Sequence, residues 1–318
     1  MRKRISIIIP SYNGVKLLSK YLPGVIVSME QTGQDNELII IDNGSTDGTG
    51  DFLGNMGKAV KVITVKENSG FINACNLGMA KAGNHIVILL NNDVEVRKDF
   101  ITPLLEGFNE NDTFAIVARS LLPHADMNNE SIVCGSFNDG NFKLLRMGLE
   151  DKKAEPKERC TNLYASGGFS AFDREKFLRL GGFDPLFFPF YWEDVDISYR
   201  AWKMGWKVIY EPRSIVFHHS HRTIGRDYSH EYTEFIDLRN KYLFFWKNFT
   251  DEEIIKKYAE NIFHKERNNW KGNNQQERRA FFEAFRKIRD VMAKRIALHE
   301  GRLSDREVLR ISANLRVE

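Results

Sequence analysis

The chain has 318 residues, of which 42% are hydrophobic and 28% charged, the balance of an ordinary globular protein. A formal net charge of +3 is too small to indicate a nucleic-acid partner, and we expect none. The three cysteines form no CxxC pair, and no apolar run approaches the roughly 20 residues of a spanning helix, so we expect a cytoplasmic protein, either soluble or peripheral on the inner membrane face.

The first ninety residues alternate between apolar, β-branched runs and helical patterns. Buried strands are predicted at 5–9, 37–41, 60–65 and 86–90. Helices are predicted at 15–29, where Pro23 marks a potential break, and at 71–81. This alternation is typical of βαβ units, so we expect an α/β fold with a largely parallel sheet.

The middle of the chain has a weaker pattern. Residues 115–159 are more polar, and turns are predicted at 128–130 and 138–141. Helices are then predicted at 174–180 and 196–204, and short strands at 207–210 and 215–217.

Beyond residue 226 the strand-like runs disappear, and charged residues interleave with aromatic ones. Residues 280–298 have the apolar spacing of an amphipathic helix. We therefore divide the chain into an α/β domain at residues 1–225 and a helical extension at residues 226–318.

Acidic residues or a histidine follow apolar runs at three separate places in the chain. Asp93 ends the fourth predicted strand, Glu193-Asp194-Val195-Asp196 comes about a hundred residues later, and His218 follows another apolar run. Open α/β sheets bind ligands at the carboxyl ends of their strands. A carboxylate there with a distant histidine suits a divalent metal that holds a phosphate, and a second carboxylate cluster suits a general base.

Six motifs in this order resemble those of the family 2 glycosyltransferases, which have the Rossmann-like, nucleotide-sugar-binding GT-A fold with a mixed central sheet. They are Pro10–Asn13, Ile41–Thr49, Glu67–Phe71 with Asn76 and Gly78, Leu90–Asp93, Gly181–Asp184 and Glu193–Asp196. The resemblance covers about residues 4–222 and is most marked for the bacterial rhamnosyltransferase and galactofuranosyltransferase branch, which makes surface polysaccharides. It implies an inverting, metal-dependent transfer of a sugar from a UDP- or dTDP-sugar to a hydroxyl of a glycan or lipid-linked acceptor.

The resemblance also implies a metal site. Asp93 matches the metal ligand of the family's Asp-X-Asp motif, for which Mn²⁺ or Mg²⁺ is the expected ion, and His218 resembles the third ligand of the galactofuranosyltransferase branch. The first motif position is Asn91, whose amide has no charge, so weaker metal affinity is expected without nucleotide. His219 is adjacent to His218, so the assignment of the histidine ligand can slip by one residue.

The acidic motif implies the catalytic base. Asp194 is expected to take the proton from the acceptor hydroxyl in a single displacement, with its pKa raised by nearby aromatic residues. Glu193 is expected to bind the acceptor, and Trp192 either stacks on an acceptor sugar or packs in the core. The alternative for the acids is a plain helix N-terminus.

The remaining motif residues imply the donor site. Asp42 is expected to accept a hydrogen bond from the base, Ser11 to touch the nucleoside, and Asn92 to belong to the same site. Looser expectations place glycines and an amide around the donor. Gly70 and Asn76 are expected to shape the floor near the nucleotide, and Gly167 and Gly168 to let the backbone approach the donor sugar.

Rival functions are weighed against this interpretation. An NAD-dependent oxidoreductase and a P-loop enzyme share the alternating pattern, but neither glycine-rich signature follows the first strand. A non-catalytic nucleotide-sugar-binding module remains the alternative. For residues 226–318 we weigh two roles, a helical subdomain that packs on the first domain or forms a homodimer, and a platform that contacts the membrane surface.

Overall fold

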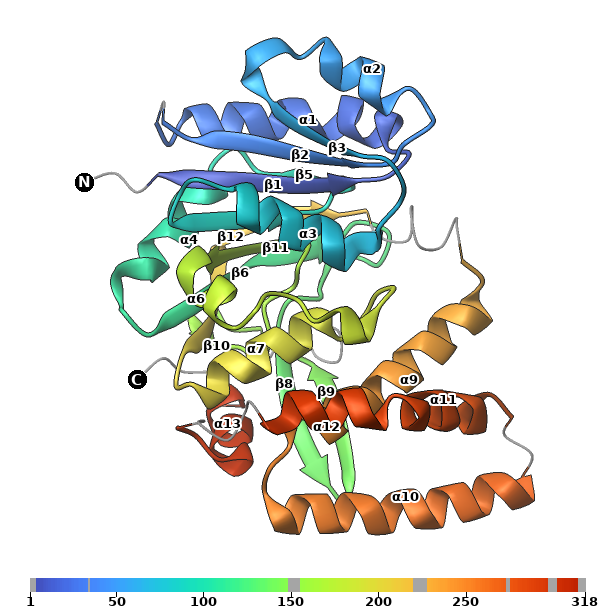
Figure 1. Cartoon of the computed structure of the whole chain (residues 1–318). Helices are drawn as coiled ribbons and strands as arrows, with labels where there is room; N and C mark the ends of the chain where they lie inside the picture. The colour runs from blue at the N-terminus through green and yellow to red at the C-terminus, as the bar shows by residue number, and fades with distance from the viewer. Residues whose placement is uncertain are drawn as a thin grey trace.

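The computed structural model describes residues 4–33, 35–147, 155–219, 228–272, 275–296 and 302–313. Its centre is a mixed sheet in the order β10-β12-β6-β11-β4-β1-β2-β3, with β5 beside β12 and β7 beside β6 (Figure 1). The strands are β1 (Ile5–Ser11), β2 (Glu37–Asn43), β3 (Lys61–Val65), β4 (Ile86–Leu90), β5 (Val94–Val96), β6 (Thr113–Leu122), β7 (Asn128–Asn129), β10 (Cys160–Thr161), β11 (Phe169–Asp173) and β12 (Lys207–His218).

Helices and 3-10 turns connect these strands. They are α1 (Val15–Glu30), α2 (Thr49–Gly54), η1 (Gly57–Ala59), α3 (Gly70–Lys81), α4 (Ile101–Glu106), η2 (Gly107–Asn109), α6 (Arg174–Arg179), η4 (Pro185–Phe187) and α7 (Glu193–Lys203). α1 continues through Pro23, so the helix is not broken there. The predicted start of α7 was wrong by three residues, and its acids lie inside the first turn.

The N-terminal half is the predicted parallel sheet. β1 lies between β2 and β4 and pairs with both in parallel, which brings their carboxyl ends to one edge. Ser11 at the end of β1 is in register with Asp42 at the end of β2. α3 packs closely on β1, because a Cβ on Gly78 would collide with Ile8. The strand ends are therefore held rigidly beside one another.

The middle of the chain holds more regular structure than the sequence pattern indicates. β6 is a ten-residue, almost entirely buried strand in the centre of the sheet, within the segment expected to be irregular. The turn expected at 128–130 lies earlier, since Asn128 and Asn129 form β7 against β6. The two short strands expected between 207 and 217 form one strand, β12, with a register shift between Glu211 and Ile215.

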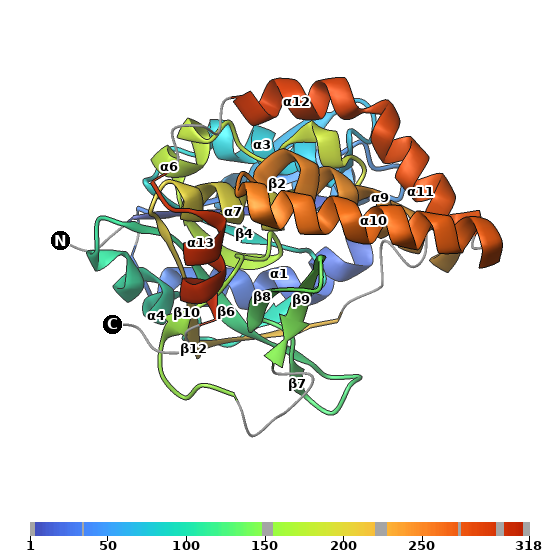
Figure 2. The ribbon, with the colours of Figure 1, turned by 90° about the horizontal axis from the view of Figure 1, so that it is seen from below.

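A separate hairpin, β8 (Val133–Asn138) and β9 (Asn141–Arg146), confirms the turn predicted at 138–141. Asp139 and Gly140 have φ angles of 49° and 71°, as a tight hairpin turn requires. Seen from below, the hairpin lies between α13 on one side and α10 on the other (Figure 2).

The C-terminal part is helical, as predicted. Its helices are α9 (His230–Asn248), α10 (Glu252–Gly272), α11 (Gln275–Arg286), α12 (Ile288–Ile296) and α13 (Asp305–Ser312). The single helix predicted at 280–298 is divided between α11 and α12. Tyr242, Phe244 and Phe249 belong to the same hydrophobic cluster as the central sheet. The predicted boundary at residue 225 lies outside the described residues.

No helix within the described ranges combines the length and the apolar character needed to cross a bilayer.

Candidate active site

A cavity of about 950 Å³ opens at the carboxyl ends of β1 and β4. Ten of the twelve predicted site residues line it: Ser11, Gly70, Asn92, Asp93, Gly167, Gly168, Trp192, Glu193, Asp194 and His218. Asp42 and Asn76 are not among its lining residues. The fold thus brings the motifs of three distant segments to one cavity, while the role of each residue remains a prediction.

The predicted metal ligands face each other across two paired strands. β12 runs antiparallel to β5 with His218 opposite Val94, and His218 Nε2 lies 3.4 Å from Asp93 Oδ1. His218 Nδ1 lies 2.7 Å from Glu130 Oε1, which also accepts a hydrogen bond from Ser120 Oγ at 2.8 Å. Burial lowers the pKa of His218, but the hydrogen bonds to Asp93 and Glu130 outweigh it and raise the pKa to about 10.

The adjacent histidine belongs to a different surrounding. His219 Nε2 lies 3.2 Å from Glu95 Oε2, and its ring stacks on Tyr21 with 5.1 Å between centroids. Of the two neighbours, the structure therefore places His218 beside Asp93. Within the described residues there is no cluster of three His, Cys, Asp or Glu side chains arranged to hold a metal.

Asp194 lines the same cavity, from the first turn of α7. Burial raises the pKa of its carboxyl to about 6, although hydrogen bonds from the backbone of Val195 and Gly167 oppose the shift. Such a carboxylate is mostly ionised at neutral pH yet more basic than a surface aspartate. The arrangement can therefore accept a proton from a hydroxyl group bound in the cavity.

Glu193 lies beside Asp194 with only 5% of its surface exposed. Burial raises the pKa of its carboxyl well above the ordinary value, and the charge of Asp194 adds to the shift. Its Oε2 has no hydrogen-bond partner among the described residues. A neutral carboxyl group in this position can donate a hydrogen bond to a ligand.

Two alternatives were considered for Trp192, stacking on an acceptor sugar and packing in the core, and its surroundings fit each of them in part. Its ring packs against Phe142 and Phe244, and Nε1 donates to Asp237 Oδ1 at 2.8 Å. The residue still lines the cavity, although it is buried. Core packing therefore accounts for most of its surface.

The predicted nucleoside residues lie at the ends of β1 and β2. Ser11 Oγ accepts a hydrogen bond from Asn92 Nδ2 at 2.9 Å, which ties the end of β1 to the Asn91-Asn92-Asp93 turn. Asp42 is buried and its Oδ1 accepts the backbone N–H of Ser45. Asn43, the next residue, lines the cavity instead.

The small residues have different surroundings. Gly70, with a φ of +81°, lies against Phe188, and a Cβ on Gly168 would come within 2.6 Å of the Asn91 amide, so both cavity walls need glycine. Asn76 exchanges two hydrogen bonds with the backbone of Phe183, at 2.8 and 2.9 Å. Its amide therefore fixes the turn after α6 rather than facing the cavity.

Sequence reasoning missed three charged residues of the cavity: Glu130, Arg146 and Asp237. Arg146 ends β9, and neighbouring Tyr164, Glu130 and Asp194 raise the pKa of its guanidinium. All three come from segments without a recognisable motif, so only the fold reveals their proximity. The one sequence feature that could have pointed to any of them is the position of Glu130, an acidic residue directly after β7.

Similar proteins include two bacterial rhamnosyltransferases. The chain is 29% identical over 223 residues to the O-antigen chain rhamnosyltransferase WbaN of Salmonella anatum, which covers 70% of this chain and 67% of that protein. It is 25% identical over 272 residues to the N-acetylglucosaminyl-diphospho-decaprenol L-rhamnosyltransferase of Mycobacterium tuberculosis, with 76% and 86% covered.

Two solved glycosyltransferases share the fold. The mannosyltransferase PcManGT from Pyrobaculum calidifontis, in complex with GDP-Man and Mn²⁺, matches with a TM-score of 0.57 and 18% identity over 95% of this chain and 82% of that one. GalNAc-T7 with UDP, GalNAc and Mn²⁺ matches with a TM-score of 0.58 and 21% identity over 79% of this chain, but over only 48% of its own. At these identities the likeness shows the GT-A fold alone.

The family model of glycosyl transferase family 2 matches residues 6–181, which include the strand ends that form one wall of the cavity. More than half of the chain is covered by this match. The chain belongs to glycosyltransferase family 2, is similar to its bacterial rhamnosyltransferases, and has the GT-A fold of a sugar-transferring enzyme of polysaccharide synthesis.

Proposed function

We propose that this enzyme transfers a sugar from a UDP- or dTDP-sugar to a hydroxyl of a glycan or lipid-linked acceptor, with inversion. The observation that carries the proposal is that Asp93 and His218, 3.4 Å apart, line the same cavity as Asp194 of α7. A donor diphosphate held by the first pair would place its sugar inside this cavity. The acceptor hydroxyl would then lie beside Asp194.

The residues around Asp93 fit a divalent metal, Mn²⁺ or Mg²⁺. A carboxylate and an imidazole nitrogen lie 3.4 Å apart, and Glu130 orients the imidazole through its other nitrogen, as partners of metal-bound histidines do. Because the pKa of His218 is raised to about 10, a metal ion would have to displace the proton on Nε2. Two protein ligands leave positions for the diphosphate and water. When bound, the ion neutralises charge on the departing nucleoside diphosphate. The neighbours PcManGT and GalNAc-T7, both solved with Mn²⁺, support this assignment.

Asp194 acts as the base in this mechanism. Its carboxylate accepts the proton of the acceptor hydroxyl as that oxygen attacks the anomeric carbon from the side opposite the diphosphate. One displacement inverts the configuration and needs no covalent intermediate. Glu193, whose carboxyl pKa is raised by burial, donates a hydrogen bond to the acceptor in its protonated form, and Gly167 and Gly168 border the donor sugar.

The donor and acceptor classes rest on the relatives. GalNAc-T7 was solved with UDP, and the mycobacterial relative is named for an acceptor in which N-acetylglucosamine is joined through diphosphate to a decaprenol lipid. A lipid-linked acceptor would bring this protein to a membrane surface, through the C-terminal helices or through a homodimer that they form.

Binding and turnover test the proposal together. UDP-, dTDP- and GDP-sugars are titrated with Mn²⁺, Mg²⁺ or EDTA by calorimetry, and we expect metal-dependent binding of a UDP- or dTDP-sugar. Asp194→Asn should retain that binding and lose at least about 1,000-fold in turnover. Asp237→Asn, which neutralises another cavity carboxylate and keeps an acceptor for Trp192, should lose far less. Binding of GDP-sugars alone would contradict the donor class.

The rival, a non-catalytic binding module, makes a different expectation. Asn91 in place of an acidic residue favours it, because one charge of the metal motif is missing. If wild-type protein binds the donor but does not cleave it to free nucleotide and sugar, that alternative is established.

A further inference from the structure

Helix α9 forms hydrogen bonds with the loop just before Asp194. The Nδ2 atom of Asn240 lies 2.8, 2.9 and 2.9 Å from the carbonyl oxygens of Phe187, Phe190 and Tyr191. Asn240 is fully buried and its Oδ1 is held by the guanidinium of Arg239. One side chain of α9 therefore gathers three carbonyl groups of the loop that leads into α7.

That loop has an unusual backbone. Tyr191 and Trp192 have φ angles of 71° and 75°, in the left-handed region that bulky side chains rarely adopt. Such residues persist only where the surroundings hold them. α9 supplies two of the restraints, since Asn240 binds the Tyr191 carbonyl and Asp237 accepts the indole N–H of Trp192 at 2.8 Å.

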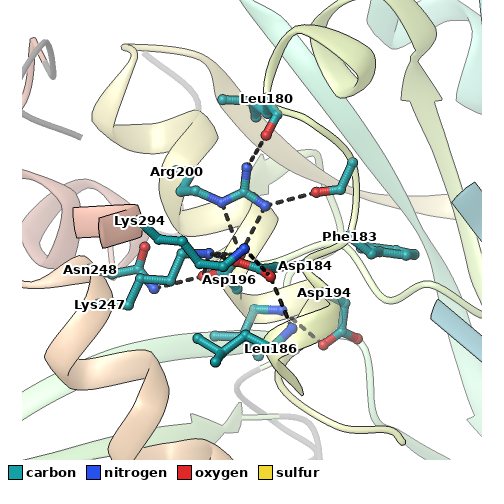
Figure 3. Close-up of polar contacts among 12 residues, drawn as sticks. Leu180, Phe183, Asp184, Leu186, Asp194, Asp196, Arg200, Lys247, Asn248 and Lys294 are labelled. Atoms are coloured by element: carbon teal, nitrogen blue, oxygen red, sulfur yellow. Dashed lines mark hydrogen bonds and ion pairs between the residues drawn. The ribbon is translucent and has the colours of Figure 1, made fainter. Parts of the chain in front are cut away.

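α9 also bonds to Asp196, just after Asp194, and to Asp184, at the start of the loop before it. Lys247 Nζ lies 2.7 Å from Asp196 Oδ1 and 2.7 Å from Asp184 Oδ2, and Asn248 Nδ2 lies 2.8 Å from Asp196 Oδ1. Arg200 binds the other oxygen of Asp196 at 2.9 Å. Figure 3 shows this network beside Asp194. Asp196 is completely buried and cannot turn without losing these partners.

We propose that α9 sets the orientation of the Asp194 carboxylate, with Asn240 and Lys247 as positioning residues that hold the backbone on either side of it. This inference rests on the proposed role of Asp194 as the base. Neither Asn240 nor Lys247 bonds to Asp93 or His218, so the predicted metal ligands should not depend on them. The main effect is expected on proton transfer.

Asn240→Ala tests the proposal, because Lys247→Met removes the buried cation that Asp184 and Asp196 share and can prevent folding. Turnover is measured as release of UDP or dTDP from the donor, with water as acceptor. We expect kcat to fall about 10- to 100-fold, because a small misplacement of a reacting group has effects of this size. Mn²⁺ affinity in the presence of UDP or dTDP should stay close to wild type, whereas the melting temperature should fall, because three carbonyl groups lose their buried donor. Lys247→Arg keeps a cation at this position and should retain most of the rate that Lys247→Met loses.

Lys294→Met is the matched control. Its ammonium group binds the other oxygen of Asp184 at 2.8 Å from α12, and its side chain is 42% exposed. Because Lys294 bonds neither to residues 187–191, which Asn240 holds, nor to Asp196, kcat should be unchanged. A loss equal to that of Asn240→Ala would show a general effect of the C-terminal helices and would overturn the proposal.

A double-mutant cycle and hydrogen exchange complete the test. Adding Asn240→Ala to Asp194→Asn should slow the residual rate no further, since no base is left to position. Amides of 187–196 should exchange faster in Asn240→Ala, while those of β1 and β4 stay protected. Unchanged exchange at 187–196, or losses that add fully, would overturn the positioning role. Full turnover by Asp194→Asn would instead refute the proposed base.

Discussion

The Asp194 carboxyl titrates in an unusual range because it lies in the wall of the cavity, with its pKa raised to about 6 by burial. A general base works only when it is ionised. At saturating Mn²⁺, where the proton of His218 does not limit metal binding, we therefore expect kcat/KM to fall about tenfold per pH unit below pH 6 and to be level between pH 6.5 and 8. The pH profile of nucleotide release measures this. An acidic limb near pH 4 would show that Asp194 is solvated like a surface residue.

Two neighbouring histidine–glutamate pairs offer a matched test of the metal site. Glu130→Gln removes the carboxylate that orients His218, and we expect Mn²⁺ affinity in the presence of UDP or dTDP to fall about tenfold. Glu95→Gln removes the partner of His219 and should leave the affinity unchanged. Calorimetric titration of Mn²⁺ measures both. Equal affinities in the two variants would contradict the choice of His218.

The positions of site residues were predictable where a motif ends a strand. Ser11, Asn92 and Asp93 lie at the carboxyl edge because the parallel pairing of β1 and β4 leaves no other place for them. Asn76 shows the limit of this reasoning. It lies on α3 but does not line the cavity, because its amide is hydrogen-bonded to the backbone of Phe183.

At the scale of elements, the buried ions between α7 and α9 join the C-terminal helices to the rest of the fold. Lys247 is 3% exposed and pairs with Asp184 and Asp196. We expect Lys247→Met to lower the free energy of unfolding by about 3–5 kcal/mol, because both buried carboxylates lose the cation they share. Arg200 is then left for Asp196, and Lys294 for Asp184. Lys294→Met, at the half-exposed end of the network, should cost less than about 1 kcal/mol. Urea unfolding of both variants measures the difference, and equal losses would show that burial does not govern these pairs.

Elements were predictable where the hydrophobic period was clear and were missed where tertiary contacts replace it. The first four strands and α3 were placed within a few residues. β6 escaped notice because Arg119 and Ser120 interrupt its apolar run, yet in the fold Arg119 pairs with Glu155 and Ser120 Oγ with Glu130. Both polar partners lie outside the strand, so the local hydrophobic pattern does not indicate it.

At the scale of the whole molecule, the sheet and the C-terminal helices share one hydrophobic core. Phe244 packs against Tyr199 and Trp192 of the α7 region, and Phe249 stacks on Tyr199. A chain of residues 1–225 should therefore expose these aromatic faces, fail to unfold cooperatively and not bind the donor. Circular dichroism melts and calorimetry check this. A fragment that melts cooperatively and binds a UDP- or dTDP-sugar would show that 226–318 is a dispensable extension.

The fold class and family could be inferred from the order of six short motifs, because their spacing reports the βαβ order of the GT-A sheet. The dependence of the site on α9 could not be inferred. The contacts of Asn240 and Lys247 join positions about fifty residues apart through side chains that no motif includes.

The stereochemistry of donor cleavage tests the proposed single displacement most directly. Proton NMR can follow wild-type enzyme with its donor, metal and water, and record which anomer of the free sugar forms first, before mutarotation. If Asp194 directs one attack from the face opposite the diphosphate, the first product has the anomeric configuration opposite to that of the donor. A first product with the donor's own configuration would contradict that mechanism.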